Sequence, residues 1–317
     1  MLGIEGRVLP FPRPIIHSLR FMAIAAERGK WAFRKVEKAL LRLAEDHDAD
    51  SVHDFRTSSR RLETLLERII DTGGRNQKKL LKSLSRIRKS AGQVRDIDVQ
   101  LAALRSLKTS QEPRRKTQLT QRLLELRAQH EKKLRKLLNE KDVREIRKRL
   151  KKASGALELE SSQDPLGVAK DMLRSVALPA GAVEEDMLHR YRMTVKQARY
   201  AAEFAVSSAE VSQFLARSKQ LQDALGHWHD WQTLTHTAID RLGDVNQSPL
   251  VAALYNVTRG KYRHAIATVS SIQSGGPGAA VKLSAAEAAR PIERRKIDPD
   301  KGDPKNSASA IRSFAAA

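Results

Sequence analysis

The chain has 317 residues, and its 59 lysine and arginine residues outnumber its 37 acidic residues to give a formal net charge of +22. A protein this basic is expected to bind a polyanion, such as nucleic acid, an anionic membrane surface or an inorganic phosphate polymer. Aromatic residues form only 4% of the chain, which argues against a reader of single-stranded nucleic acid, and the absence of cysteine excludes disulfides and thiolate metal sites.

The chain contains no apolar segment of the roughly 20 residues needed to span a bilayer, so we expect no membrane span. The apolar stretch 15–26 is interrupted by His17, Ser18 and Arg20, and its helical periodicity continues beyond it. We therefore assign it to a longer helix rather than to a signal peptide. The lack of cysteine fits a reducing compartment, and we expect a cytoplasmic protein.

The first half of the chain is predicted to be helical, because its apolar residues recur at helical spacing and no sustained period-two alternation occurs. Residues 1–14 contain three prolines and are expected to form an irregular lead-in. Asp50 or Ser51 is expected to cap the second helix, and Gly92 marks a weak point in the third. The helices are expected at about 15–46, 52–71, 76–107 and 112–152.

The second half repeats this organisation after a connector at 154–165. From residue 274 the composition turns to glycine, proline, alanine and charged residues, so we predict a disordered tail over 274–317. The helices between are expected at about 166–177, 184–208, 211–243 and 248–273.

Two motifs occur twice in the same order. His53 and His189 each begin a His-x-x-Arg pattern, and they lie 136 residues apart. The segments Gly92-x-x-Arg95-Asp96 and Gly226-x-x-His229-Asp230 follow them, 134 residues apart. This order and near-constant offset predict an internal duplication, with each half a bundle of about four helices.

Each histidine motif places a stripe of cations on one face of a helix, because spacings of 3, 7 and 10 return to nearly the same side. Apolar residues lie beside each stripe and are expected to face the core, from Phe55 to Ile69 and from Leu188 to Ala202. Like charges at this spacing repel one another, so the repeated arrangement predicts a ligand with many negative charges. The stripes are His53, Arg56, Arg60 and Arg61 in the first half, and His189, Arg192, Lys196 and Arg199 in the second.

Two neighbouring helices carry further basic stripes, which with the two histidine stripes make four basic faces. If these four faces converge, they form a cationic channel. The additional stripes are Arg34, Lys35, Lys38 and Arg42 on the first helix, and Lys78, Lys82, Arg86 and Lys89 on the third.

These motifs resemble the CHAD family, the "conserved histidine α-helical domain". That family shows a His-x-x-Arg-x-x-x-Arg-Arg helix, a Gly-x-x-Arg-Asp segment, a second His-x-x-Arg-x-x-x-Lys helix and a Leu-Gln-Asp-x-Leu-Gly segment, found here at 221–226. The resemblance implies an all-α, internally duplicated pair of four-helix bundles with pseudo-two-fold symmetry. We place this domain at 15–273, with halves at about 15–153 and 166–273.

The resemblance also implies a function: inorganic polyphosphate is bound in a basic groove or pore, and the protein is recruited to polyphosphate granules. His229 departs from the family, which usually has asparagine or arginine there. The segment Glu158-x-Glu160-x-Ser162 lacks the lysine of the CYTH triphosphatase motif, so we expect a stand-alone CHAD protein. The implied ligands are the eight residues of the two histidine stripes, with Lys82, Arg86, Arg95 and Lys219 as weaker candidates.

Two other functions stay open. Non-specific nucleic-acid binding is supported equally by charge, although no helix-turn-helix spacing or zinc ligand set is evident. A His-Asp metal phosphohydrolase is suggested by His53-Asp54 and His229-Asp230, with His227 and His236 as further ligands. We favour polyphosphate binding without catalysis, metal or cofactor, with at most weak nucleic-acid binding, and leave the oligomeric state open.

Overall fold

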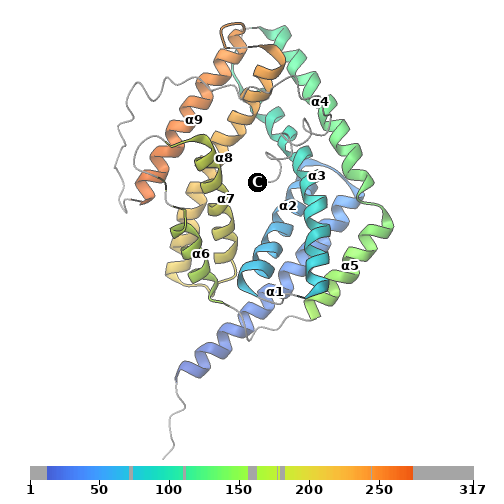
Figure 1. The fold of residues 1–317 in the computed structure, drawn as a ribbon, viewed down its shortest axis with the longest axis vertical. Helices are drawn as coiled ribbons and strands as arrows, with labels where there is room; N and C mark the ends of the chain where they lie inside the picture. The colour runs from blue at the N-terminus through green and yellow to red at the C-terminus, as the bar shows by residue number, and fades with distance from the viewer. Residues whose placement is uncertain are drawn as a thin grey trace, which may run out of the picture.

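The computed structural model describes residues 13–70, 74–109, 112–155, 163–176, 178, 183–243 and 245–273. These residues form helices and no strands, as predicted. Most of the predicted lead-in, residues 1–12, and the predicted tail, residues 274–317, lie outside them. The helices are α1 (Arg13–Glu45), α2 (Ala49–Thr64), α3 (Arg75–Ser106), α4 (Pro113–Lys136), α5 (Glu140–Gly155), α6 (Pro165–Arg174), α7 (Glu185–Ala202), α8 (Ala209–Leu242) and α9 (Pro249–Gln273), with a π-helical turn η1 (Leu65–Ile69) after α2 (Figure 1).

The single helix predicted at 112–152 is wrong, because the structure divides it into α4 and α5. Leu137 ends α4, and Asn139 then caps α5: the backbone N–H of Asp142 donates to Asn139 Oδ1 at 2.9 Å. Asparagine with acidic residues in the following turn is a helix-start pattern, and it interrupts the segment without proline or glycine.

Two other predicted boundaries are also wrong. α7 ends at Ala202 rather than 208, and the carbonyl groups of Glu203 and Ala205 after it accept hydrogen bonds from Arg28 of α1. At the start of α2 the cap is Asp48 rather than Asp50 or Ser51, since Asp48 Oδ1 accepts from the Ser51 N–H at 2.6 Å.

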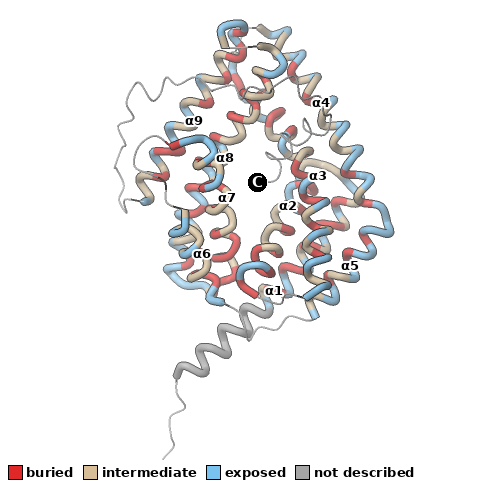
Figure 2. Tube along the Cα trace, in the orientation of Figure 1, coloured by how far each residue is buried: buried red, intermediate tan, exposed pale blue. Residues whose placement is uncertain are grey.

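The helices with the two histidine motifs face one another across the middle of the molecule. α2 and α3 lie on one side and α7 and α8 on the other, and α2 contacts α7 while α3 contacts α8 (Figure 1). α1 packs against α2 and α5, α6 against α7, and α9 against α8. Figure 2 shows extended exposed surface along α4 and α5, on the outside of the molecule.

The core is divided into three clusters, and two of them combine both halves of the chain. The largest joins α1, α2, α3 and α5 to α6, the end of α7 and the start of α8. A second joins α3 and α4 to α8 and α9, and the third lies among α7, α8 and α9. The apolar residues predicted to lie beside the stripes are buried, including Phe55, Leu62, Leu188 and Val195 at 0% exposure.

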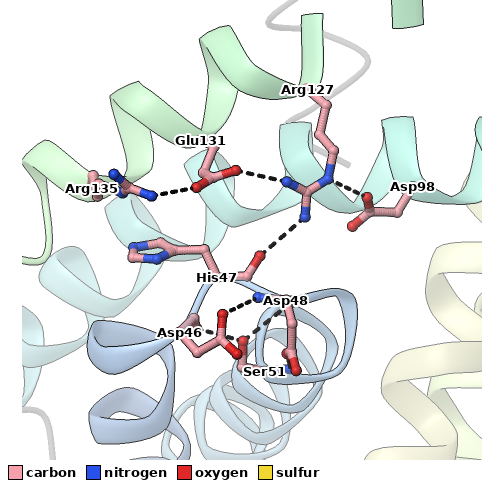
Figure 3. A network of polar contacts seen from close by, with 8 residues as sticks. All are labelled: Asp46, His47, Asp48, Ser51, Asp98, Arg127, Glu131 and Arg135. Atoms are coloured by element: carbon pink, nitrogen blue, oxygen red, sulfur yellow. Dashed lines mark hydrogen bonds and ion pairs between the residues drawn. The ribbon is translucent and has the colours of Figure 1, made fainter. Parts of the chain in front are cut away.

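A polar network holds the turn that precedes α2. Arg127 of α4 donates to Asp98 of α3 at 2.7 Å, to Glu131 at 2.7 Å and to the carbonyl oxygen of His47 at 3.1 Å (Figure 3). Because these bonds fix the turn to two other helices, they fix the start of α2 and therefore the orientation of its basic stripe.

A second set of hydrogen bonds joins the start of α4 in the first half to the start of α9 in the second half. Glu112, just before α4, accepts from Ser248 Oγ at 2.5 Å and from the Leu250 N–H at 3.0 Å. Its carboxylate thereby caps the start of α9.

Candidate anion-binding site

The basic stripes of α2 and α7 meet between the two halves. Arg56 and Arg60 lie on α2, Arg192 and Lys196 on α7, and we call these four residues the cation cluster. Arg192 is buried at 8% exposure and the other three are half-buried. Like charges removed from water are unfavourable unless an opposite charge is supplied.

The charge of the cation cluster is incompletely balanced within the protein. Arg56 Nη2 lies 3.9 Å from Asp96 Oδ1, and Asp230 is the carboxylate that most affects Arg192. Neither Arg192 nor Lys196 forms an ion pair with a described residue, and Arg192 Nε is buried without a hydrogen-bond acceptor among them. The cluster therefore has unused capacity to bind an anion.

Burial and mutual repulsion change the charge state of the cluster. Burial, together with the neighbouring charges of Arg192 and Arg56, lowers the pKa of Lys196 to about 7. Burial, assisted by Arg88 and Arg56, lowers the pKa of Arg60 to about 10. In the free protein, Lys196 is therefore partly deprotonated at neutral pH, and a bound anion would restore its charge.

Gly92 of α3 makes room for Arg56. A Cβ atom built on Gly92 would overlap Arg56 Nη1, whereas nothing lies within 4 Å of a Cβ built on Gly226. α3 continues as one helix through Gly92. Gly92 therefore allows the Arg56 guanidinium to approach α3 closely, and it does not interrupt the helix as the sequence had suggested.

The three histidines of the motifs lie around the cluster. Burial lowers the pKa of His53, and Arg95 of α3 lowers it further. Burial likewise lowers the pKa of His189 and of His229, whose ring centroids lie 4.9 Å apart. Each shift favours the neutral form of the imidazole in the free protein.

Arg61 and Arg199, the outermost residues of the two stripes, are paired with a carboxylate. Glu203 Oε2 accepts from Arg61 Nε at 2.5 Å, and Glu203 Oε1 lies 3.3 Å from Arg199 Nη2. Arg199 Nη1 also donates to Gln222 at 2.9 Å. These two predicted ligands are therefore already occupied in the free protein.

Comparison with known proteins gives the family. The CHAD domain family model matches residues 30–238, which is more than half of the chain. The chain belongs to the CHAD domain family. The crystal structure of the CHAD domain from the plant Ricinus communis is similar, with a TM-score of 0.52 and 17% sequence identity over 86% of this chain and 91% of that chain. No curated protein matches the sequence.

The weaker candidates predicted from the CHAD resemblance are spread more widely. Arg95 affects the pKa of both Arg56 and His53, after the larger effect of burial, and so lies beside the cation cluster. Lys219 pairs with Asp223 at 2.6 Å on α8, and Arg86 is exposed on α3. Lys82 lines a separate surface depression of about 350 Å³ together with Arg75, Lys78 and Lys79.

The basic stripe of α1 lies partly beside the end of the α2 stripe. Arg34 lines a cavity of about 670 Å³ together with Arg61 and Glu203, whereas Arg42 pairs with Asp48 and Asp54 at 3.5 and 3.4 Å. The stripes of α2 and α7 therefore meet, and Arg34 of α1 adjoins them beside Arg61 and Glu203, while Lys78 and Lys82 of α3 line a separate depression.

Sequence reasoning missed Arg88 and Tyr200. Arg88 is buried, pairs with Glu63 at 2.5 Å and adds to the effect of burial on Arg56 and Arg60. It precedes Gly92 by four residues, so extending the Gly-x-x-Arg pattern back by one helical turn would have found it. Tyr200 lies within range of the cluster, and its ring lies 5.3 Å from the Arg61 guanidinium carbon.

The other sites considered from sequence can be placed as well. Among the described residues, no three histidine, cysteine or acidic side chains gather as a metal-binding group. Asp54, the acidic member of one His-Asp pair, contacts Arg42 on the outside of α2. No described helix has both the length and the apolar character that crossing a bilayer requires.

Proposed function

We propose that this CHAD domain protein binds inorganic polyphosphate in the cation cluster and performs no chemistry on it. The observation that carries the proposal is that buried Arg192 and half-buried Lys196 have no ion-pair partner among the described residues and lie opposite Arg56 and Arg60. A linear polyanion can meet cations on two facing helices at once, which a single small ion cannot do. Guanidinium groups bind phosphate oxygens in pairs, and lysine adds a point charge.

Polyphosphate fits the cation cluster better than a nucleic acid does. It carries about one negative charge per phosphate unit and has no base or sugar to recognise. Single-stranded nucleic acids are usually held by stacking on exposed aromatic rings, and Tyr200 beside the cluster is buried. The affinity should depend strongly on salt, because binding releases counterions from the polymer.

The internal duplication predicted from the sequence motifs fits a two-sided site. The sequence motifs pair α2 with α7 and α3 with α8, and these are the helices that contact one another. Asp96 acts on Arg56 as Asp230 acts on Arg192. We interpret the two halves as related bundles with pseudo-two-fold symmetry, each contributing one wall of the site and one aspartate that orients an arginine.

The cellular role follows from binding alone. A cytoplasmic protein that binds polyphosphate without cleaving it would be recruited to polyphosphate granules. The short distance between Asp54 and Arg42 supports a structural role for that aspartate rather than one in a His-Asp phosphohydrolase.

A competition titration tests the proposed ligand. Labelled long-chain polyphosphate would be bound at about 150 mM salt, where exposed charges are well screened, and challenged with duplex DNA, single-stranded RNA and tripolyphosphate at matched charge. We expect only unlabelled long-chain polyphosphate to compete strongly. Equal competition by duplex DNA would contradict the proposal and make nucleic acid the leading ligand.

A further inference from the structure

A carboxylate ends the basic stripe of α7. His189, Arg192, Lys196, Arg199 and Glu203 follow one another at intervals of three and four residues, so they share one side of the helix. Four groups that favour anions are thus followed by one anion of the protein itself. Glu203 lies at the C-terminal cap of α7, where a negative charge is disfavoured by the helix dipole.

The Glu203 carboxylate lies between guanidinium groups of two helices. It accepts from Arg61 Nε at 2.5 Å and from Arg61 Nη2 at 3.3 Å, and it also lies 3.3 Å from Arg199 Nη2. One guanidinium comes from α2 and the other from α7. The same two-sided grip by guanidinium groups is the one expected for a phosphate unit between these helices.

Tyr200 connects this group to the cation cluster. Its ring lies 5.3 Å from Arg61, and it also lies close enough to affect the pKa of Arg56 and Arg192, where burial has the largest effect. Although burial lowers the pKa of Arg61, the hydrogen bond and charge of Glu203 outweigh it and raise the pKa overall. Arg61 is therefore fully paired, in contrast to Lys196.

We infer that Glu203 is an internal anion that occupies one end of the ligand site and excludes polyphosphate from Arg61 and Arg199. This inference rests on the proposed function and adds where the binding site ends: the polymer is held by the cation cluster and does not extend past Glu203. Removing the negative charge of Glu203 frees two further guanidinium groups and extends the site.

A purely structural role for Glu203 predicts a different result. If the carboxylate only ties α2 to α7, its removal lowers stability and leaves polyphosphate affinity unchanged or weaker. If it also competes with the ligand, its removal lowers the stability of the free protein but raises affinity. The two roles are separated by measuring binding and stability on the same variant.

The test compares Glu203→Gln with Glu37→Gln, a matched variant that removes one negative charge from another interhelical pair, Glu37–Arg147 at 2.8 Å between α1 and α5. We expect Glu203→Gln to bind long-chain polyphosphate about tenfold more tightly than the parent protein. Its plot of log affinity against log salt should be steeper by about 1.4, because two more cations contact the polymer. Glu37→Gln should match the parent.

A second variant keeps the inference falsifiable. Adding Arg61→Gln to Glu203→Gln should remove about half of the gained salt dependence, whereas Arg61→Gln alone should leave affinity within about twofold of the parent. If Glu203→Gln binds no more tightly than Glu37→Gln, this inference fails while the proposed function stands. If the parent protein itself does not bind polyphosphate, both fail.

Discussion

The most highly charged helices and the candidate site use positive charge in opposite ways. On α4 and α5, five exposed or half-buried arginines pair with carboxylates three or four residues away. These pairs are Arg122–Glu125, Arg127–Glu131, Arg135–Glu131, Arg144–Glu140 and Arg149–Glu145. In the cation cluster, Arg192 is buried and Lys196 is half-buried, and neither has such a partner among the described residues.

The difference shows that the number of charges is a poor guide to a binding site. Exposed pairs at helical spacing stabilise a helix by a few tenths of a kcal/mol and already satisfy their cations. Buried cations without partners destabilise the free protein and become favourable only when an anion arrives. The predictions below test this contrast, beginning with the largest expected effect.

The double variant Arg56→Ala with Arg192→Ala removes one arginine from each wall of the site. Each charge-assisted hydrogen bond contributes about 1.5–3 kcal/mol, so we expect polyphosphate affinity to fall by about 100-fold or more with helical content unchanged. The matched control, Arg122→Ala with Arg135→Ala on α4, should lose less than about threefold. Equal affinity of the double variant and the parent would disprove the site assignment.

Polyphosphate should stabilise the folded protein, because it neutralises repulsion that the unfolded chain does not have. At a concentration of about 100 Kd, the gain is about 2.7 kcal/mol, which raises Tm by about 4 °C in a protein of 317 residues. The measurement is a thermal melt with and without long-chain polyphosphate. The double variant should show almost no shift, and an unchanged Tm in the parent at saturation would contradict this prediction.

Affinity should also depend on pH through Lys196. Burial and the nearby arginines lower its pKa to about 7 from 10.5, so the free protein loses this proton above pH 7, whereas bound polyphosphate favours the charged form. Binding then takes up a proton, and affinity falls by up to about tenfold per pH unit above pH 7. In Lys196→Met this extra dependence should disappear.

The sign of the stability effect is opposite. Since the folded state binds fewer protons than the unfolded state between pH 7 and 10.5, the stability of the free protein should rise over this range as the penalty at Lys196 is relieved. The histidines around the cluster are neutral throughout, because their pKa values lie below 6.5. The free energy of unfolding would be measured with urea at several pH values between 7.5 and 9. It should rise with pH in the parent protein, and this rise should be absent in Lys196→Met.

The smallest expected effect comes from the paired glycines. Gly92→Ala should displace the Arg56 guanidinium and weaken polyphosphate binding by about fivefold to tenfold, since it moves the group without removing it. Gly226→Ala should leave binding unchanged and raise stability by about 1 kcal/mol, as alanine favours the helix and meets nothing within 4 Å. Similar binding by both variants would show that Gly92 does not position Arg56.

Much of the fold and half of the site could be predicted from local patterns. Helical spacing identified the stripes of α2 and α7, and the family match confirms the CHAD resemblance. The end of α7 could not be predicted, because the segment after it is held by Arg28, a residue 175 positions away in the chain. The Arg199–Glu203 pair has a local signal, because the two residues are four apart, but only the folded chain brings Arg61 to the same carboxylate.

The break between α4 and α5 has a local signal in the sequence, the helix cap at Asn139. Asn139 followed by Glu140 and Asp142 is a capping pattern, but the continuous charged periodicity on both sides obscured it. Long periodic segments are therefore worth searching for internal caps even where proline and glycine are absent.

The shared core has a consequence for how the chain folds. The largest cluster contains residues from α1 to α8, and Glu112 at the start of α4 caps α9 on the other half. Two of the three core clusters need residues of both halves, so we do not expect the halves to fold independently despite their similar motifs. We expect a single cooperative unfolding transition, so a destabilising substitution in one half should lower one common Tm for both halves.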